Sequence, residues 1–341
     1  MKIIVDAFGG DHAPTEILKG CRMALDELPD LQLMLTGRAD EIRRVAQAEA
    51  ISLDRMEIAD APTVISMDDA PTDIMRAKKD CSMAEGLRQL AADKGDAFIS
   101  AGSTGALVVG ATMIVKRIKG IKRAALAPVI PKDEGTFMLI DSGANVECKP
   151  EYLMQFGVMG SIYMEKVMGV NRPRVGLVNV GTEDCKGGEL QHEAFRLLSR
   201  APVNFIGNIE ARTVPSNGAD VVVTDGFTGN VMLKLYEGVS ATLFKKVKDV
   251  MMQRPLNKLA ALLLKKDLGT LKKSVDYNEF GGAPLMGISK PVFKAHGSSK
   301  ARTFYNALKI TYRFVQGDVI GQIAGAIAEQ SVAEPAAETV E

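Results

Sequence analysis

Short apolar runs alternate along most of the chain with longer segments in which apolar residues recur every three or four positions. The short runs predict buried strands, and the periodic segments predict helices packed against them. This alternation predicts an α/β fold, a three-layer α/β/α sandwich whose mostly parallel, doubly wound sheet is covered by helices on both faces. The predicted strands are residues 3–5, 31–36, 56–59, 97–100, 137–140, 175–178, 204–206, 221–223 and 291–295.

The segments between these strands set the expected helices and loops. Residues 60–73 hold two prolines and four aspartates and predict a long loop, whereas 281–287 is glycine-rich and predicts a flexible return. Residues 333–341 predict a disordered tail, so we expect a single domain over residues 1–332. The predicted helices are residues 14–28, 40–50, 74–79, 81–94, 106–117, 150–168, 189–200, 231–244, 300–315 and 318–331.

Residues 243–275 differ from the rest of the chain because they are both basic and amphipathic. They carry nine basic and two acidic residues in a chain whose formal net charge is zero. Pro255 breaks the preceding helix, and apolar residues then follow at helical spacing. We predict a helical insertion over about 243–280 that serves as a membrane-surface helix, a dimer contact or a partner dock. The residues expected to dock are Lys258, Leu259, Leu263, Lys265 and Lys266.

A second basic cluster lies between residues 116 and 123 and includes Lys116 and Arg117. A solvated surface is its ordinary interpretation, and docking of an acidic partner protein is the sharper one.

Composition excludes several classes of protein. The zero net charge gives no overall attraction to nucleic acid. The four cysteines are widely spaced and form no CxxC pair, which argues against a metal knot or disulfide scaffold and fits a reducing cytosol. No apolar run approaches the ~20 residues that span a bilayer. The start of the chain predicts a strand rather than a signal peptide.

Candidate chemistry concentrates in polar, glycine-rich turns that follow five of the predicted strands, where parallel sheets bind ligands. The turn at 225–230 leads from a strand into a helix, so backbone N–H groups and the helix dipole favour an anion there. Asp225, Gly226, Thr228 and Asn230 are its candidate residues, although Asp, Thr and Asn also cap helices. No turn matches the dinucleotide or P-loop pattern, so no nucleotide is predicted.

Three further turns supply the remaining candidates. Gly102, Ser103 and Thr104 are placed either to bind phosphate or to cap a helix, and a Ser-His-Asp triad is disfavoured because no neighbouring base is evident. Two other turns offer cations or donors that also have ordinary surface or packing interpretations. They contribute Gly181, Thr182 and Lys186 in one case and His296 in the other.

Seven segments in order, covering nearly the whole chain, resemble the bacterial phosphate acyltransferase family (acyl-acyl carrier protein:phosphate acyltransferase) of phospholipid synthesis. Two positions depart from the family pattern, since Ser103 stands where Asn is frequent and Phe8 where Met is frequent. The segments are residues 5–14, 99–106, 141–145, 179–184, 207–212, 223–230 and 295–299.

The resemblance implies a fold like phosphotransacetylase and isopropylmalate dehydrogenase. It also implies reversible transfer of a long-chain fatty acyl group from acyl carrier protein to inorganic phosphate, which gives acyl phosphate. It further implies a homodimer in the cytoplasm, peripherally associated with the inner face of the membrane, where a membrane glycerol-phosphate acyltransferase uses the product.

The residue inventory suits that reaction without a metal or organic cofactor. Our sequence-based hypothesis assigns Lys186 to phosphate binding, with Ser103 and Thr104 as further phosphate ligands. Asn230 and the backbone after Gly226 would stabilise the oxyanion. Asp225 would orient Lys186 or His296. Two alternatives stay open, a phosphotransacetylase-like enzyme that uses acyl-CoA and a non-catalytic adaptor on a lipid surface.

Overall fold

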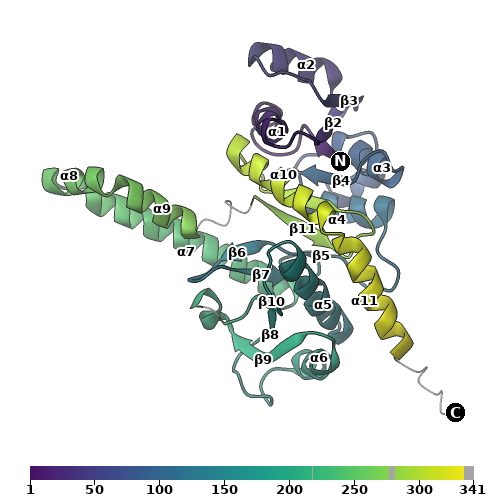
Figure 1. The fold of residues 1–341 in the computed structure, drawn as a ribbon, viewed down its shortest axis with the longest axis vertical. Helices are drawn as coiled ribbons and strands as arrows, with labels where there is room; N and C mark the ends of the chain where they lie inside the picture. The colour runs from purple at the N-terminus through teal and green to yellow at the C-terminus, as the bar shows by residue number, and fades with distance from the viewer. Residues whose placement is uncertain (217, 276–280, 334–341) are drawn as a thin grey trace.

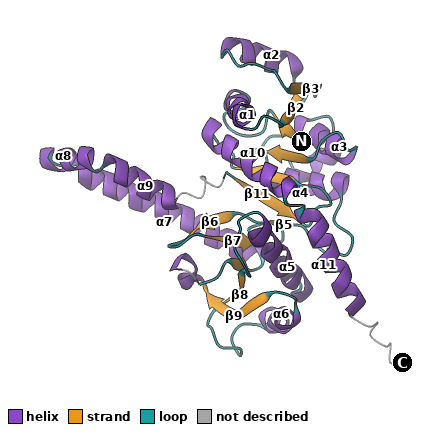
Figure 2. Ribbon diagram, viewed as in Figure 1, coloured by secondary structure: helices purple, strands orange, loops and turns teal. Residues whose placement is uncertain are grey.

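The computed structural model describes residues 1–216, 218–275 and 281–333, which form two sheets with helices on their faces (Figures 1 and 2). The first sheet has seven strands in the order β3-β2-β1-β4-β12-β11-β5. Its strands are parallel from β3 to β12, while β11 runs antiparallel to both its neighbours. The bounds are β1 (Lys2–Asp6), β2 (Gln32–Gly37), β3 (Met56–Asp60), β4 (Ala97–Ser100), β5 (Ala125–Leu126), β11 (Gly282–Met286) and β12 (Val292–Ala295).

The second sheet has five strands in the order β6-β7-β10-β8-β9. It is parallel except for β6, which pairs antiparallel with β7. The three buried valines of β10 lie between β7 and β8, so the turn that follows them opens at the middle of this sheet. The bounds are β6 (Val129–Pro131), β7 (Thr136–Ile140), β8 (Arg174–Asn179), β9 (Asn204–Glu210) and β10 (Val221–Val223).

Helices cover both sheets, with α1 packed on α10 in the first half and α5 packed on α6 and α11 in the second (Figure 1). Short 3-10 turns lie at Pro71–Met75 and Ala211–Ser216, and a π turn at Ala111–Val115 extends α4. The bounds are α1 (Thr15–Glu27), α2 (Ala39–Ala48), α3 (Ser82–Ala91), α4 (Thr104–Gly110), α5 (Pro150–Lys166), α6 (Glu189–Arg200), α10 (Ala301–Gln316) and α11 (Val319–Ala333).

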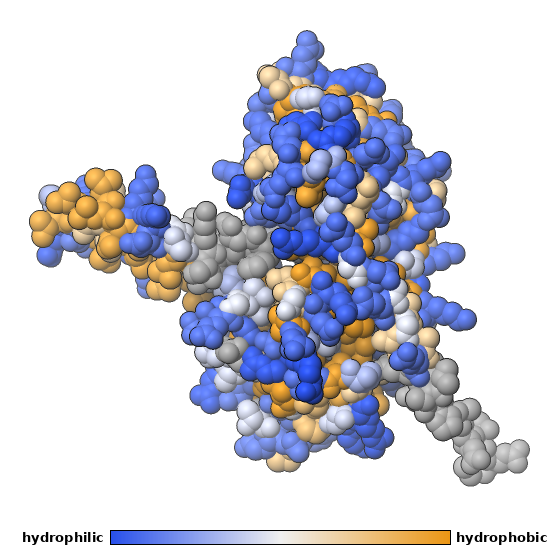
Figure 3. Space-filling view, in the orientation of Figure 1, coloured by the Kyte–Doolittle hydropathy of each residue, from blue (hydrophilic) through white to orange (hydrophobic). Residues whose placement is uncertain are grey.

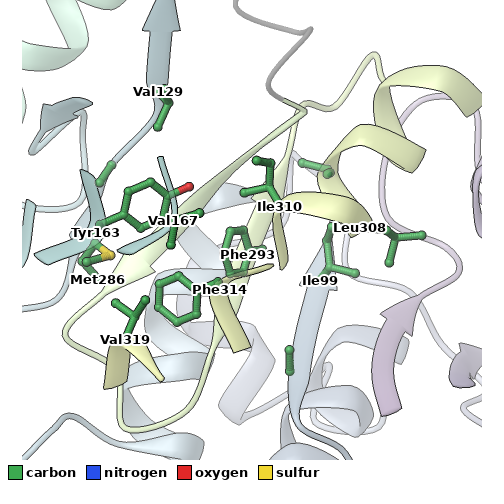
Figure 4. Packing of buried hydrophobic residues seen from close by; sticks show 14 of the residues in the cluster. Ile99, Val129, Tyr163, Val167, Met286, Phe293, Leu308, Ile310, Phe314 and Val319 are labelled. Carbon is green, nitrogen blue, oxygen red and sulfur yellow. The ribbon is translucent and has the colours of Figure 1, made fainter. Parts of the chain in front are cut away.

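One hydrophobic core continues across the two sheets. At their junction Phe314 of α10 meets Phe293 of β12 edge to face, with ring centroids 5.2 Å apart, and lies 5.9 Å from Tyr163 of α5 (Figure 4). All three side chains are buried. Aromatic pairs of this geometry add about 0.5–1.5 kcal/mol each beyond the area they bury, so this cluster ties the two sheets together.

Three helices form an arm that projects from the body beside the second sheet: α7 (Gly226–Met252), α8 (Pro255–Leu263) and α9 (Lys265–Val275) (Figure 1). Only Gly226, Gly229 and Leu233 of α7 are buried, and α8 has no buried residue. The outer end of the arm presents a largely apolar surface in the space-filling view (Figure 3). The arm therefore stands clear of the core.

The α/β prediction is confirmed, but the strands divide into two sheets and several local predictions are wrong. The expected flexible return at 281–287 is the buried strand β11, because its backbone pairs with β12 and β5 despite the glycines and Pro284. Strands β5 and β6 were not expected, since two- and three-residue strands leave almost no periodic signal. The predicted tail at 333–341 falls outside the described residues from 334 onward.

The ends of several elements also differ from the predicted ones. β9 continues to Glu210 instead of ending at residue 206, and α7 begins at Gly226 and runs to Met252 instead of covering 231–244. The helix expected at 74–79 is instead the 3-10 turn at Pro71–Met75, whose first residue is a proline with a preset helical φ.

Candidate active site

A cavity of about 680 Å³ lies between the two sheets. The turns after β4 and β12 of the first sheet line one wall, and the turn after β7 together with α7 lines the other. Part of the lining is apolar, including Val108, Val129 and Leu233. The polar lining residues are Asp11, Thr104, Ser142, Asn230, Lys234, Glu237, Lys294, His296 and Ser298.

Asp6 fixes the wall that belongs to the first sheet. Its carboxylate accepts hydrogen bonds from the Ser100 hydroxyl at 2.7 Å and from the backbone N–H of Phe8 at 3.2 Å. The Gly102 N–H in turn donates to Ser100 Oγ at 3.0 Å. A Cβ on Gly9 would lie 2.6 Å from the Gly102 nitrogen, so glycine is required where the two turns touch. Burial raises the pKa of Asp6, opposed by these hydrogen bonds.

Among the candidates in the turn after β4, only Thr104 lines the cavity. The buried Ser103 caps α4, with its hydroxyl accepting from the Ala106 N–H at 3.4 Å. Gly102 lies against the turn after β1, since a Cβ built on Gly102 would lie 3.5 Å from the Cα of Gly9. The capping interpretation of Ser103 is therefore the one that the structure displays.

Asp141 organises the opposite wall. Its Oδ1 accepts from the N–H groups of Leu126 at 2.9 Å, Gly143 at 3.2 Å and Ala144 at 3.1 Å. Its Oδ2 accepts from the backbone and the side-chain amide of Asn145, at 2.7 and 2.9 Å. Burial raises the pKa of Asp141, against the effect of the hydrogen bonds. The cavity-lining turn 142–144 is thus held in one conformation.

The start of α7 is pressed onto this turn. Asp225 caps the helix by accepting from the Thr228 N–H at 2.9 Å, and the Gly226 N–H donates to Asn145 O at 2.8 Å. A Cβ on Gly229 would lie 1.9 Å from the Asp141 carbonyl oxygen. Of this predicted group, only Asn230 lines the cavity. Asp225, Gly226 and Thr228 support it from behind.

Two residues of the turn after β12 complete the site. His296 Nδ1 accepts a hydrogen bond from the Ser298 N–H at 3.2 Å and lies 2.8 Å from the Ser298 hydroxyl. An accepting Nδ1 places the proton of the neutral ring on Nε2. Burial, and then the charge of Lys294, lower the pKa of His296, which favours that neutral ring. Lys294 was not among the predicted site residues.

The structure does not bring Lys186, Gly181 or Thr182 to the cavity. They belong to the turn after β8, in which Gly181 is buried while Thr182 and Lys186 are exposed. Asn179 Nδ2 holds this turn by donating to Lys186 O at 2.9 Å. In the second sheet β10 separates β8 from β7, so the turn after β8 lies two strands away from the cavity-lining turn after β7.

All predicted docking residues are exposed. Lys116 and Arg117 lie just after the π turn, and Lys258, Leu259, Leu263, Lys265 and Lys266 lie on the outer part of the arm. None of the described helices is long and apolar enough to cross a membrane. Within the same residues, no group of three or more His, Cys, Asp and Glu side chains is arranged to hold a metal ion.

Solved structures with this architecture include acyl-transferring enzymes. A phosphotransacetylase from Streptococcus pyogenes aligns with a TM-score of 0.61 at 16% identity, covering 93% of this chain and 94% of that one. A branched-chain phosphotransacylase from Enterococcus faecalis V583 aligns with a TM-score of 0.58 at 15% identity, covering 92% and 99%. These likenesses confirm the predicted phosphotransacetylase-like fold.

Relatives by sequence are much nearer. The family model described as fatty acid synthesis protein matches residues 1–322. A phosphate acyltransferase of Clostridium tetani (strain Massachusetts / E88) is 46% identical over 323 residues, 95% of this chain and 97% of the relative. One of Oceanobacillus iheyensis is 46% identical over 328 residues, 96% of this chain and 97% of the relative. The chain therefore belongs to the fatty acid synthesis protein family and groups with the phosphate acyltransferases, which are acyltransferase enzymes.

Proposed function

We propose that this protein transfers a long-chain fatty acyl group from acyl carrier protein to inorganic phosphate, reversibly forming acyl phosphate for phospholipid synthesis. The observation that carries the proposal is the mixed cavity between the sheets. Hydrogen-bonding groups from Thr104, Asn230 and His296 meet there with an apolar lining that includes Val108 and Leu233. An acyl thioester and an inorganic anion need this combination of surfaces.

The reaction requires mainly that the protein position the two substrates and stabilise the negative charge of the tetrahedral intermediate. A phosphate oxygen attacks the thioester carbonyl, and the C–S bond of the tetrahedral intermediate then breaks to release the carrier thiol. Phosphate is already an anion, and a thiol with a pKa of about 8.5 leaves readily as thiolate. Holding the two substrates in a reactive geometry supplies a large part of the acceleration.

Each cavity residue then has a definite part. The Asn230 amide donates to the developing oxyanion, and the Thr104 hydroxyl donates to phosphate. The Nε2–H of neutral His296 protonates the departing thiolate. Asp225, Gly226 and Thr228 position Asn230, and Ser103 and Gly102 hold the turn that carries Thr104. Lys186, Gly181 and Thr182 have no substrate contact in this scheme, because their turn lies outside the cavity.

The arm supports the proposed donor and location. Acyl carrier protein is acidic, and the arm exposes Lys258, Lys265 and Lys266 beside Leu259 and Leu263. Such a surface suits both an acidic protein and an anionic lipid headgroup layer. We therefore propose a homodimer bound peripherally to the inner face of the cell membrane, where a membrane glycerol-phosphate acyltransferase takes the product.

The second candidate, a phosphotransacetylase-like enzyme using acyl-CoA, is favoured by the fold likeness alone. Purified protein should be incubated with palmitoyl-carrier protein or palmitoyl-CoA, with and without phosphate, and acyl phosphate trapped as the hydroxamate. The proposal expects phosphate-dependent product with a clear preference for the carrier-linked substrate. A preference for the CoA thioester supports the second candidate. Thioester cleavage at the same rate with and without phosphate rules out both.

A further inference from the structure

Lys294 is a buried cation in the cavity wall. It lies in β12, between Phe293 and Ala295 of an otherwise apolar strand, and only 8% of its surface is exposed. Among the described residues, no carboxylate oxygen lies within 4.0 Å of the Lys294 ammonium nitrogen. The exposed Lys234 and the half-buried Lys290, by contrast, each have a carboxylate partner.

Two backbone carbonyl groups fix the position of this ammonium group. Lys294 Nζ donates to the carbonyl oxygen of Ala101 at 3.1 Å and to that of Ala295. An ammonium group has three N–H donors, and within the described chain no other hydrogen bond from Lys294 Nζ is found. The side chain lines the cavity together with His296 and Gly297. One donor therefore remains to meet a bound molecule.

Charge gives the reason to expect an anion. Removing a charge from water without an adjacent counter-charge is unfavourable, and two neutral carbonyls offset only part of this cost. Asp6 and Asp11 attract the ammonium only at longer range, and Lys234 repels it. Burial lowers the pKa of Lys294 to about 8, so most of the group is charged at neutral pH. A bound anion would supply the missing counter-charge.

We propose that Lys294 is the cation that binds the attacking inorganic phosphate, held by the wall of the first sheet opposite Asn230 on the wall of the second. The assignment rests on the proposed function and deepens it. It places phosphate beside Thr104 and the Ala101 turn, and it replaces Lys186 as the phosphate ligand. Lys294 acts as a phosphate-binding residue through direct contact.

The test compares Lys294→Gln and Lys294→Met with Lys290→Met. Glutamine retains a donor for the Ala101 carbonyl but removes the charge, so it separates phosphate binding from the structural hydrogen bond. Lys290 precedes the same strand, but it pairs with Asp93 and bonds Leu90 O outside the cavity. Charge-assisted hydrogen bonds are worth about 1.5–3 kcal/mol, so we expect KM for phosphate to rise about 10- to 100-fold in both Lys294 variants.

KM for the acyl donor should change less than about twofold in these variants, and Lys290→Met should behave as wild type. In the wild type, kcat/KM for phosphate should fall above about pH 8 as Lys294 loses its proton, and this limb should be absent in Lys294→Gln. The charged neighbours that bear on this titration are Asp6, Asp11, Lys234 and His296. An unchanged KM for phosphate in Lys294→Gln overturns the assignment.

Phosphate binding is measured separately from turnover, as the rise in melting temperature that inorganic phosphate gives without any acyl donor. Wild type and Lys290→Met should show the rise, and Lys294→Gln should lose it. This measurement keeps its meaning if wild type makes no acyl phosphate, which counts against the proposed function alone. A full phosphate-induced rise in Lys294→Gln counts against Lys294 whatever the turnover.

Discussion

The cavity and the arm distribute polar and apolar groups in opposite ways. Around the cavity, charged groups such as Asp6, Asp141 and Lys294 are buried and hydrogen-bonded. On the arm, Leu256 is 80% exposed and Leu263 is 77% exposed. Each arrangement is costly in an isolated chain, because buried charges need compensation and exposed apolar patches need cover.

The difference separates a region whose polar groups are satisfied within the chain from one whose apolar side chains are left exposed. The carboxylates of Asp6 and Asp141 find their donors within the chain, so the walls of the cavity are preorganised before any substrate arrives. None of the residues of α8 is buried, so its leucines are available for the partner or membrane contact that we propose. Variants in the cavity should therefore change chemistry, and variants on the arm should change location.

The largest effect is expected at Asn230. In Asn230→Ala the oxyanion loses its side-chain donor, and removal of one such donor lowers kcat by about 10²–10³-fold. Steady-state acyl phosphate formation measures this. Asn257→Ala is the matched control on the arm, and it should keep wild-type kcat. Within the described residues, the Asn257 side chain donates a hydrogen bond to Val250 O. Equal losses in the two variants would contradict the contrast.

Asp141→Asn should act through the turn it holds. An amide in place of the carboxylate sets an N–H donor against backbone N–H groups, so at least one bond at Gly143, Ala144 or Asn145 is lost. Buried charge-assisted bonds of this kind are worth about 1.5–3 kcal/mol, and a loss of that size should appear in urea unfolding. We also expect kcat to fall about tenfold or more, since a displacement of about 1 Å in an active site can lower the rate by about 10²-fold. A stability loss with unchanged kcat would show that the turn is not part of the site.

Asp220 provides a comparison remote from both regions. It precedes β10 at the end opposite the cavity and pairs with Lys132 at 2.6 Å and Arg174 at 3.1 Å. Burial opposes ionisation, but these partners lower the pKa of Asp220 to about 2. Because the folded pKa is depressed, its stabilisation is complete above about pH 4 and disappears as the pH falls toward 2.

We expect Asp220→Asn to lower the free energy of unfolding by about 2–3 kcal/mol at pH 7. The gap from wild type should close between about pH 4 and pH 2, while kcat at pH 7 stays unchanged. Urea titrations across this range measure it. A gap that persists at the lowest pH would mean that the carboxylate contributes through packing and not through its charge.

The arm should give the smallest effect on the enzyme and a clear one on its location. Leu259→Glu and Leu263→Glu each remove an apolar anchor worth about 1.5–3 kcal/mol, so affinity for anionic vesicles should fall at least about tenfold. Melting temperature and turnover of a soluble substrate should hold, because neither side chain is buried. Gln253→Glu adds the same charge without removing an anchor and should retain most binding. Sedimentation with vesicles measures this, and retained binding in both leucine variants would refute membrane docking.

What the sequence could predict depends on how locally each feature is encoded. The turn at 225–230 and His296 follow obvious strands, so their polar character was visible, and Thr104, Asn230 and His296 do meet in the cavity. Lys294 was not predicted because it lies within strand β12 and not in the polar turn that follows the strand. Lys186 looked equivalent to the others, because the sequence carries no record of strand order. The strand order β7-β10-β8 shows that its turn lies two strands away from the turn after β7 that lines the cavity.

The continuity of α7 sets the geometry of delivery. The helix carries Asn230 in its second turn and ends at Met252 in the arm, 27 residues in all without a break. At 1.5 Å per residue it is about 40 Å long, so it sets a fixed distance between the cavity and the outer part of the arm. Under the proposed function, an acyl phosphate made in the cavity has to cover this distance to reach a membrane at the arm, and each residue inserted into or deleted from α7 changes the distance by about 1.5 Å.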